Sequence, residues 1–303
     1  MYNRRNFIKT VLAGSAFLVL PETIKAISFK NPIKLVILHT SDTHSHLDPL
    51  PFDDRRFSNL GGVERRAGLI NKIRSENEHV LLLDSGDMFQ GTPYFNSYGG
   101  KIILELMSLM GYDAATLGNH EFDNGINWLA DMIKYAKFPV VNCNFDISET
   151  ALNGKIKKYI VFEMGGLKIG ITGLGINPYS LIKESNYKGL VYKDPVIEGE
   201  TIAKMLKEKL KCNFVIALSH LGLEMGNVID DKKLAAQTRN IDLILGGHTH
   251  TFLKSPLTVN NLDNKPVVIQ HSGSEGVCLT RLDFTFSKDK IDMKSEQTYL
   301  IEN

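Results

Sequence analysis

Short motifs of Asp, Asn and His recur along the chain, and these residue types are the ones that bind divalent metal ions. Two motifs space their members by one residue, Asp42-x-His44 and His248-x-His250. In an extended segment, side chains two positions apart point to the same side, so each pair is expected to offer two ligands together. Imidazole and carboxylate groups suit Zn, Mn, Fe and similar ions. No CxxC pair is present, which argues against a thiolate zinc site.

Further motifs carry the same chemistry. They contribute Asp87, Asn119, His120, Asp123 and His220. Five of the nine histidines fall within these motifs, and glycines beside several of them let the backbone turn sharply near an ion or a phosphate. Each motif alone also fits a structural turn. The prediction of a metal site therefore depends on their joint occurrence.

The motifs follow predicted buried strands, and this placement is what would bring them together. The strands are expected at residues 34–40, 80–83, 114–117, 214–218 and 243–245. Ligands of open α/β sheets bind outside the carboxyl ends of the strands. Five strand ends are thus expected to direct Asp, Asn and His side chains to one rim.

The segments between these strands complete an α/β pattern. Helices are expected at 63–74, 102–110, 127–137 and 200–210, and further strands at 139–142, 267–270 and 280–286, the last two antiparallel. A hairpin is expected where residues 159–163 and 168–172 flank Gly165-Gly166. Alternating strands and helices favour a mainly parallel, buried sheet. Without repeats or linkers, we expect one compact α/β domain in which two sheets carry outer helices.

Composition excludes several classes of protein. The chain has 303 residues, 43% hydrophobic, with 35 Lys and Arg against 34 Asp and Glu. These values are ordinary for a globular protein. The near-zero net charge offers no basic face for a nucleic acid polymer. Three cysteines, Cys143, Cys212 and Cys278, are too few for a disulfide scaffold.

Residues 1–26 are interpreted separately as a signal peptide. Adjacent Arg4 and Arg5 precede an apolar run at residues 11–20, which is too short to span a bilayer. A charged segment before a short apolar run is typical of an export signal, and the arginine pair is similar to a twin-arginine signal. A frayed amphipathic leader is the alternative. Periplasmic or other export is expected, with cleavage near Ala26 or retention as a membrane anchor both open.

Taken together, the motifs resemble the five-block signature of the calcineurin-like metallophosphoesterases. The blocks are Asp42-Thr43-His44, Gly86-Asp87, Gly118-Asn119-His120-Glu121-Phe122-Asp123, Ser219-His220 and Gly246-Gly247-His248-Thr249-His250. The long third block and residues 84–93 resemble the catalytic domain of the 5′-nucleotidase / UDP-sugar hydrolase branch. The resemblance covers residues 33–290, which we take as the catalytic domain, with 291–303 as a C-terminal tail.

This resemblance implies a four-layer αββα sandwich of two mixed sheets flanked by helices, with a centre of two divalent ions (Mn, Zn, Fe or Co). One ion would be held by Asp42, His44 and His250, and the other by Asn119, His220 and His248. Asp87 would bridge the two ions. Members of the branch often carry Gln at the position of His250, so the metal preference of this chain is open.

The resemblance also implies a reaction. Hydroxide activated by the metals would attack phosphorus in a phosphate monoester, most simply a 5′-nucleotide. His120 would stabilise charge on the transferring phosphoryl group or protonate the leaving alkoxide, and Asp123 would orient its imidazole. Capping of the following helix is the other role open to Asp123. The alternatives are a cyclic-nucleotide or other phosphodiesterase, a nucleotide-sugar pyrophosphatase, and a metal-binding subunit without turnover.

Four other polar residues near the motifs remain undecided on sequence. His46 is either a solvated loop residue or a contact of the ligand shell or substrate. Asp84 either accepts a hydrogen bond from a ligand histidine or ends a strand. His39 is expected in the core near the end of its strand, and the role of His271 is left open.

Substrate recognition is the part of the resemblance that is missing. Catalytic domains of this branch are normally followed by a domain that holds the nucleoside, and this chain ends at Asn303. We therefore expect either a separate partner chain that supplies a substrate domain or broad action on small phosphoesters. Membrane contact is expected only through an uncleaved signal.

Overall fold

The computed structural model describes residues 32–287 and 290–302. The predicted signal peptide, residues 1–26, lies outside the described residues. Within the described part of the chain, no helix is both long enough and apolar enough to cross a bilayer.

The first sheet has five strands in the order β13-β12-β1-β2-β3. Their bounds are β1 Ile33–Thr40, β2 Val80–Asp84, β3 Ala114–Ala115, β12 Cys278–Ser287 and β13 Lys290–Leu300. β1 pairs with β2 in parallel and with β12 antiparallel, so the sheet is mixed. The carboxyl ends of β1, β2 and β3 therefore lie at the same edge of the sheet.

The second sheet has six strands in the order β10-β11-β9-β8-β6-β5. Their bounds are β5 Tyr159–Met164, β6 Leu167–Leu174, β8 Phe214–Ser219, β9 Leu243–Gly246, β10 Leu257–Asn260 and β11 Pro266–His271. The hairpin predicted at Gly165-Gly166 is confirmed, since β5 and β6 pair antiparallel across it. β6, β8, β9 and β11 run parallel. A separate ribbon pairs β4 (Phe145–Asp146) with β7 (Val191–Tyr192).

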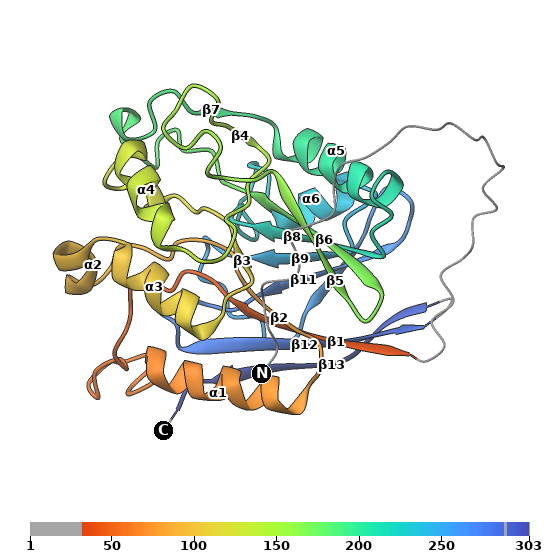
Figure 1. Cartoon of the computed structure of the whole chain (residues 1–303), viewed down its shortest axis with the longest axis horizontal. Coiled ribbons are helices and arrows are strands. Elements are labelled where there is room, and N and C mark those ends of the chain that lie inside the picture. The colour runs from red at the N-terminus through yellow and green to blue at the C-terminus, as the bar shows by residue number, and fades with distance from the viewer. Residues whose placement is uncertain (1–31, 288–289, 303) are drawn as a thin grey trace, which may run out of the picture.

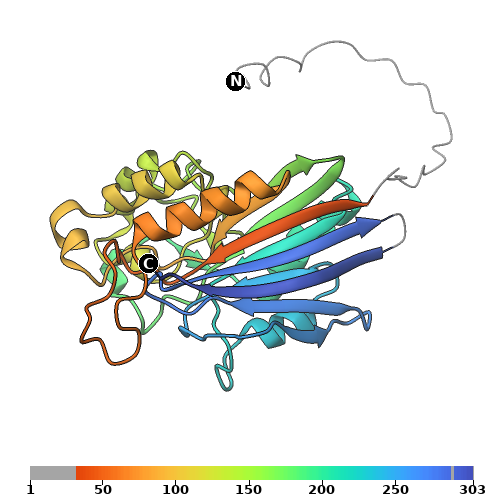
Figure 2. The same cartoon turned by 90° about the horizontal axis from the view of Figure 1, so that it is seen from below.

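Helices cover the outer faces of both sheets (Figure 1). Their bounds are α1 Val63–Glu76, α2 Pro93–Tyr98, α3 Lys101–Met110, α4 Ile126–Met132, α5 Pro195–Glu208 and α6 Asp231–Gln237, with 3-10 turns η1 His120–Phe122, η2 Ile133–Tyr135 and η3 Glu184–Asn186. Figure 2 shows α1 lying along the first sheet. α5 and α6 pack on the second sheet through residues such as Leu206 and Leu234.

Three apolar layers hold this stack together. In β1, Leu35 and Ile37 face the second sheet, whereas Val36 and Leu38 face the helices. Alternation of this kind places apolar side chains on both faces of a strand, which suits a strand covered on both sides. The four-layer αββα sandwich with two mixed sheets is thereby confirmed.

Several predicted elements differ from those observed. Residues 139–142 form only isolated bridges, Ala115–Val140 and Val141–Lys157. The strand predicted at 267–270 is antiparallel to β10 but parallel to β9. The segment 291–303, expected as a tail, mostly belongs to edge strand β13, which pairs with β12. The mostly polar sequence of β13 gave no strand pattern, because an edge strand is held by backbone pairing more than by buried side chains.

Candidate metal centre

The predicted ligands gather at one rim of the two sheets. Asp42 and His44 follow β1, Asp87 follows β2, and Asn119 lies beyond β3. His220 follows β8, and His248 and His250 follow β9. Two groups of potential metal ligands result, in each of which one atom per residue lies within 4.8 Å of the others: Asp42, His44 and His250, and Asp87, His220 and His248.

The first of these, here called the open group, consists of Asp42, His44 and His250. The Nε2 atoms of His44 and His250 lie 2.9 Å apart, and His250 Nε2 is 3.6 Å from Asp42 Oδ1. Asp42 and His44 are buried, whereas the side chain of His250 is 42% exposed. Three donor atoms thus converge on a point that solvent can reach.

The second, here called the buried group, consists of Asp87, His220 and His248, with Asn119 beside it. His220 Nε2 lies 3.1 Å from Asp87 Oδ2, and Asn119 Oδ1 lies 3.0 Å from His248 Nδ1. His220 and Asp87 are almost completely buried. The two groups adjoin, since His220 Nε2 is 3.9 Å from Asp42 Oδ1.

The local backbone brings the ligands together in a way that the sequence did not indicate. Asp42 and His44 have φ of 51° and 46°, and His248 and His250 have φ of 74° and 52°. The premise that each pair lies on an extended segment is therefore wrong. Residues other than glycine seldom adopt this left-handed backbone conformation, and those that do cluster at functional sites. The two members of each motif are therefore brought together by turns of the backbone and not by the alternation of side chains along a strand.

Charge interactions within the centre are strong. Burial, together with the neighbouring Asp87, raises the pKa of Asp42 to about 8, although His220 opposes this shift. Burial would also raise the pKa of Asp87, but His220, His120 and His44 hold it well below its usual range. Perturbed pKa values of this kind concentrate at functional sites.

The pKa values of the histidines are also shifted in both directions. Burial lowers the pKa of His44 and that of His248 to about 4, and it also lowers the pKa of His250. Burial would lower the pKa of His220 as well, but the Asp87 carboxylate raises it to about 10. The first three imidazoles are therefore neutral at pH 7, which is the form that binds metals.

Unsatisfied atoms test whether these residues fit divalent cations. Among the described residues, Asp42 Oδ2 and His220 Nε2 are buried and have no hydrogen-bond partner. Buried polar atoms are nearly always satisfied. A cation at each group would satisfy both atoms and offset the repulsion between the Asp42 and Asp87 carboxylates. The donor set and its geometry thus fit two divalent ions.

The residues behind His220 fix its orientation. Its Nδ1 lies 2.6 Å from the carbonyl oxygen of Ser85, so Nδ1–H donates and Nε2 faces the centre. A second hydrogen bond of this kind is a common feature of metal-binding histidines. Asp84 bonds no ligand histidine in the structure; its carboxylate accepts from Thr40 Oγ1 at 2.7 Å and from the Gly86 amide at 2.9 Å.

Glu121 is a structural residue of the centre that the sequence patterns did not single out. Its buried carboxylate accepts hydrogen bonds from the amides of Gly118, Asp87, Met88 and Phe89. These bonds tie the loop after β2 to the loop after β3. Its place inside the third motif, between His120 and Phe122, was the available signal.

His120 and Asp123 form the expected pair at the edge of the centre. His120 Nδ1 lies 2.8 Å from Asp123 Oδ2, and both side chains are about one-third exposed. This hydrogen bond raises the pKa of His120. The His120 ring lies 5.3 Å from that of His44, and its backbone amide donates to Asp87 Oδ1. The capping alternative for Asp123 is not observed, because α4 begins after Gly125 without a side-chain cap.

The remaining histidines are placed as follows. His39 is buried between Ser85 Oγ at 2.9 Å and Ser272 Oγ at 2.6 Å. His271 is buried, and its Nε2 lies 2.7 Å from Asp231 Oδ2. Both are core residues, as expected for His39, and the structure assigns His271, which the sequence left open, to the core as well. His46 is partly exposed and lines a small cavity beside the centre.

Comparison with known proteins agrees with this geometry. Residues 35–252 match the family described as calcineurin-like phosphoesterase. The 5′-nucleotidase of Rattus norvegicus is 35% identical over 297 residues, which cover 91% of this chain and 49% of the relative. The trifunctional nucleotide phosphoesterase protein YfkN of Bacillus subtilis (strain 168) is 33% identical over 286 residues, covering 84% of this chain and 18% of that protein.

A solved structure shares the fold. The 5′-nucleotidase precursor from Thermus thermophilus superposes with a TM-score of 0.78 and 33% identity, over 88% of this chain and 54% of the other. The chain spans about half the length of the rat relative and less of the B. subtilis protein. The chain belongs to the calcineurin-like phosphoesterases.

Proposed function

We propose that this calcineurin-like phosphoesterase hydrolyses phosphate monoesters, with 5′-nucleotides as the first substrates to test. The observation that carries the proposal is the adjacency of two metal-ligand groups to a hydrogen-bonded histidine–carboxylate pair. The relatives named as 5′-nucleotidases support the choice of substrate. Their greater length leaves the substrate open, because only part of each relative corresponds to this chain.

The ligand assignment follows the two groups. Asp42, His44 and His250 would hold one ion, while Asn119, His220 and His248 would hold the other. Asp87 would lie between them, since its pKa responds to both His44 and His220. When bound, a pair of divalent ions supplies a hydroxide nucleophile at neutral pH and offsets the charge of a phosphoryl group.

His120 would act on the departing group. The Asp123 carboxylate accepts from Nδ1 and raises the pKa of the imidazole, which favours the form with a proton on Nε2. A proton at Nε2 can pass to the leaving alkoxide or stabilise charge on the phosphoryl oxygens. Asp123 fixes the ring, and the backbone bond from His120 to Asp87 ties this pair to the metal centre.

The role of His120 can be separated from metal binding. His120→Ala is expected to lower kcat by about 10²–10⁴ while the bound metal, measured by elemental analysis, stays at the wild-type level. Asp123→Asn should lower kcat less, because the imidazole is still present but less well oriented. Full activity of His120→Ala would contradict the assignment.

Substrate class is tested on metal-loaded protein. p-Nitrophenyl phosphate, bis-p-nitrophenyl phosphate, 5′-nucleotides, UDP-sugars and cyclic nucleotides would be compared with Mn²⁺, Zn²⁺ or Co²⁺ added. Faster hydrolysis of monoesters is the expected result. A preference for the diester or for UDP-sugars would favour the phosphodiesterase or pyrophosphatase alternative. No turnover despite two bound ions would indicate a non-catalytic metal-binding subunit.

We also infer export and a separate source of nucleoside specificity. The charged and apolar run in residues 1–26 supports export by a twin-arginine-type signal, and detection of the protein outside the cytoplasm would test it. The rat relative extends beyond the region that matches this chain, and a partner chain that supplies a substrate domain is our proposal for nucleoside recognition. Tight nucleoside selectivity of the isolated chain would argue against such a partner.

A further inference from the structure

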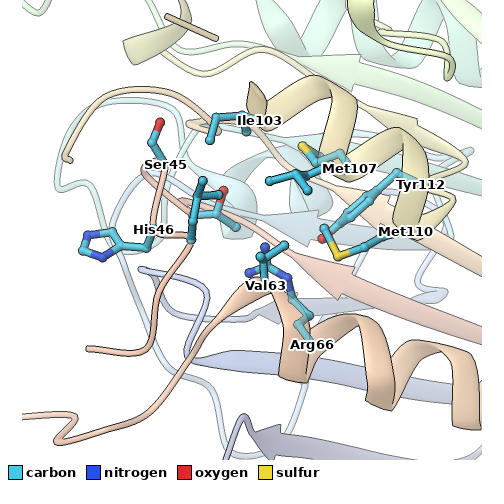
Figure 3. A pocket seen from close by; sticks show the side chains of 11 residues that line it. Ser45, His46, Val63, Arg66, Ile103, Met107, Met110 and Tyr112 are labelled. Carbon is cyan, nitrogen blue, oxygen red and sulfur yellow. The ribbon is translucent and has the colours of Figure 1, made fainter. Parts of the chain in front are cut away.

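A buried arginine lines a small cavity beside the metal centre (Figure 3). The cavity is about 10 Å³ in volume, and it is lined by Arg66 of α1, Tyr112, side chains of α3, Thr43 and residues 45–47. Arg66 is only 3% exposed. Among the described residues, its Nε and Nη1 have no hydrogen-bond partner, and no carboxylate forms an ion pair with it.

The Arg66 charge requires a compensating group that does not contact the guanidinium directly. A guanidinium is charged at every accessible pH, and a buried charge without compensation is costly. A cavity of about 10 Å³ holds one water molecule and excludes a phosphate group. The compensation must therefore reach Arg66 through a water or through neighbouring hydroxyl groups.

A chain of hydroxyl groups leads from this cavity to a buried acid. Tyr112 OH lies 2.8 Å from Thr40 Oγ1, which donates to Asp84 Oδ2 at 2.7 Å. Because the only hydroxyl hydrogen of Thr40 goes to Asp84, Tyr112 must donate to Thr40. The phenol oxygen thus keeps lone pairs that can accept a hydrogen bond from the side of the cavity.

Asp84 connects these hydroxyl groups to the metal centre. It is fully buried, and its Oδ1 accepts from the Gly86 amide at 2.9 Å. The turn that follows is tight: Gly86 has φ of 89°, and a Cβ there would lie 2.5 Å from the Gly118 nitrogen. Burial raises the pKa of Asp84 to about 6, whereas its hydrogen bonds and the Arg66 charge oppose that rise. Asp87 lies immediately after this turn.

We infer that Arg66 is a positioning residue of the metal centre, which stabilises the ionised Asp84 through one water, Tyr112 and Thr40. The second oxygen of Asp84 then holds the Gly86–Asp87 turn. This inference uses the metal-binding part of the proposed function but not its substrate.

Glu275 is the competing partner. Arg66 Nη1 lies against Gly276, where a Cβ would be only 2.2 Å away, and Glu275 Oε2 is buried without a partner. Glu275 is, however, already paired through Oε1 with Arg56 at 2.8 Å. The experiment must therefore separate Asp84 from Glu275.

Calorimetric titration of the metal-free full chain with Mn²⁺ provides the test. Arg66→Met should weaken Mn²⁺ binding about tenfold, as loss of an outer support does, and the Tm of the metal-free protein should fall because the buried Asp84 loses the charge that stabilises it. Arg66→Lys should restore most of the affinity. Arg74→Met is the matched control: Arg74 lies on α1, as Arg66 does, and its loss breaks an ion pair with Asp113, so Tm should fall with Mn²⁺ affinity unchanged.

Double-mutant cycles identify the partner. The effects of Arg66→Met and Asp84→Asn on Mn²⁺ affinity should be non-additive, and so should those of Arg66→Met and Tyr112→Phe, whereas Arg66→Met and Glu275→Gln should be additive. Unchanged affinity in Arg66→Met, or coupling only to Glu275, would overturn the inference. Wild-type protein that binds Mn²⁺ but hydrolyses no phosphoester would overturn the proposed function alone; absence of Mn²⁺ binding would overturn both.

Discussion

The two ligand groups contain similar residues but differ in how the protein supports them. In the buried group, His220 is fully enclosed and its Nδ1 donates to the Ser85 carbonyl at 2.6 Å. In the open group, His250 exposes 42% of its side chain, and its hydrogen-bond partner among the described residues is His44. One group is fixed before any ion arrives, while the other has a ligand that solvent can reach.

The surroundings strengthen this contrast. The Asp87 loop is tied down by the carboxylate of Glu121, and Asn119 adds an oxygen donor beside His248. His44 has a longer bond, 3.3 Å, to the Phe89 carbonyl. Preorganised ligands bind an ion without a further ordering cost. We therefore expect the buried group to retain its ion more tightly and the open group to exchange its ion more readily.

The largest effect is expected from a substitution that weakens both ligand groups and so removes the difference between them. Asp87→Asn should weaken metal binding at both groups, because this carboxylate interacts with histidines of each. We expect kcat/KM to fall by more than about 10³ and the metal content to drop below one ion per chain. Asp263→Asn, a change at an exposed surface aspartate, serves as the control. Retention of one ion with wild-type affinity would show that Asp87 belongs to a single group.

Smaller effects are expected from substitutions in one group at a time, which measure the difference in ion affinity between the buried and the open group. His220→Ala should weaken binding of one ion by about 100-fold or more, and His250→Ala by about tenfold. Elemental analysis after stepwise dialysis against a chelator would report both values, and the wild-type protein should lose its ions in two steps. Equal losses in the two variants, or release in one step, would contradict the distinction between open and buried groups.

The smallest effect concerns His39, which supports the buried group through Ser85. Ser85 Oγ donates to the Leu245 carbonyl, so it accepts from His39 Nε2, and Nδ1 in turn accepts from Ser272. Burial lowers the pKa of His39 to about 3. The folded protein thus keeps this imidazole neutral where the unfolded chain protonates it.

Protonation of His39 in the unfolded chain makes the protein less stable at low pH. Below the unfolded pKa of about 6.5, the unfolded chain binds more protons at this residue, so the free energy of unfolding falls as the pH drops from about 6.5 towards 3. One such group contributes about 1 kcal/mol per pH unit. Denaturant unfolding of metal-free wild type and His39→Gln between pH 4 and 7 would measure this. The variant should show the shallower dependence, and identical slopes would exclude His39 as the source.

Much of the centre could be predicted from sequence because its ligands stand beside strand ends. Parallel strands bring their carboxyl ends to one edge, so Asp42 and Asp87 converge within the first sheet and His220 and His248 within the second. The packing of the two sheets then brings these two sets together. The same rule failed for local geometry, since it gave no sign of the left-handed backbone at Asp42 and His44. It also missed β13, whose polar sequence lacks the alternation of a buried strand.

The sequence by itself determined the ligand types, their order along the chain and the sheets that position them, because strand periodicity and motif spacing are local properties. Only the tertiary structure decided which group is buried, that Glu121 joins two loops and that Arg66 has no paired acid in the part of the chain that the structure describes. These features depend on contacts between residues distant in sequence, such as His220 with Ser85. No local pattern encodes such contacts; they arise when the two sheets pack and exclude water from one ligand group more than from the other.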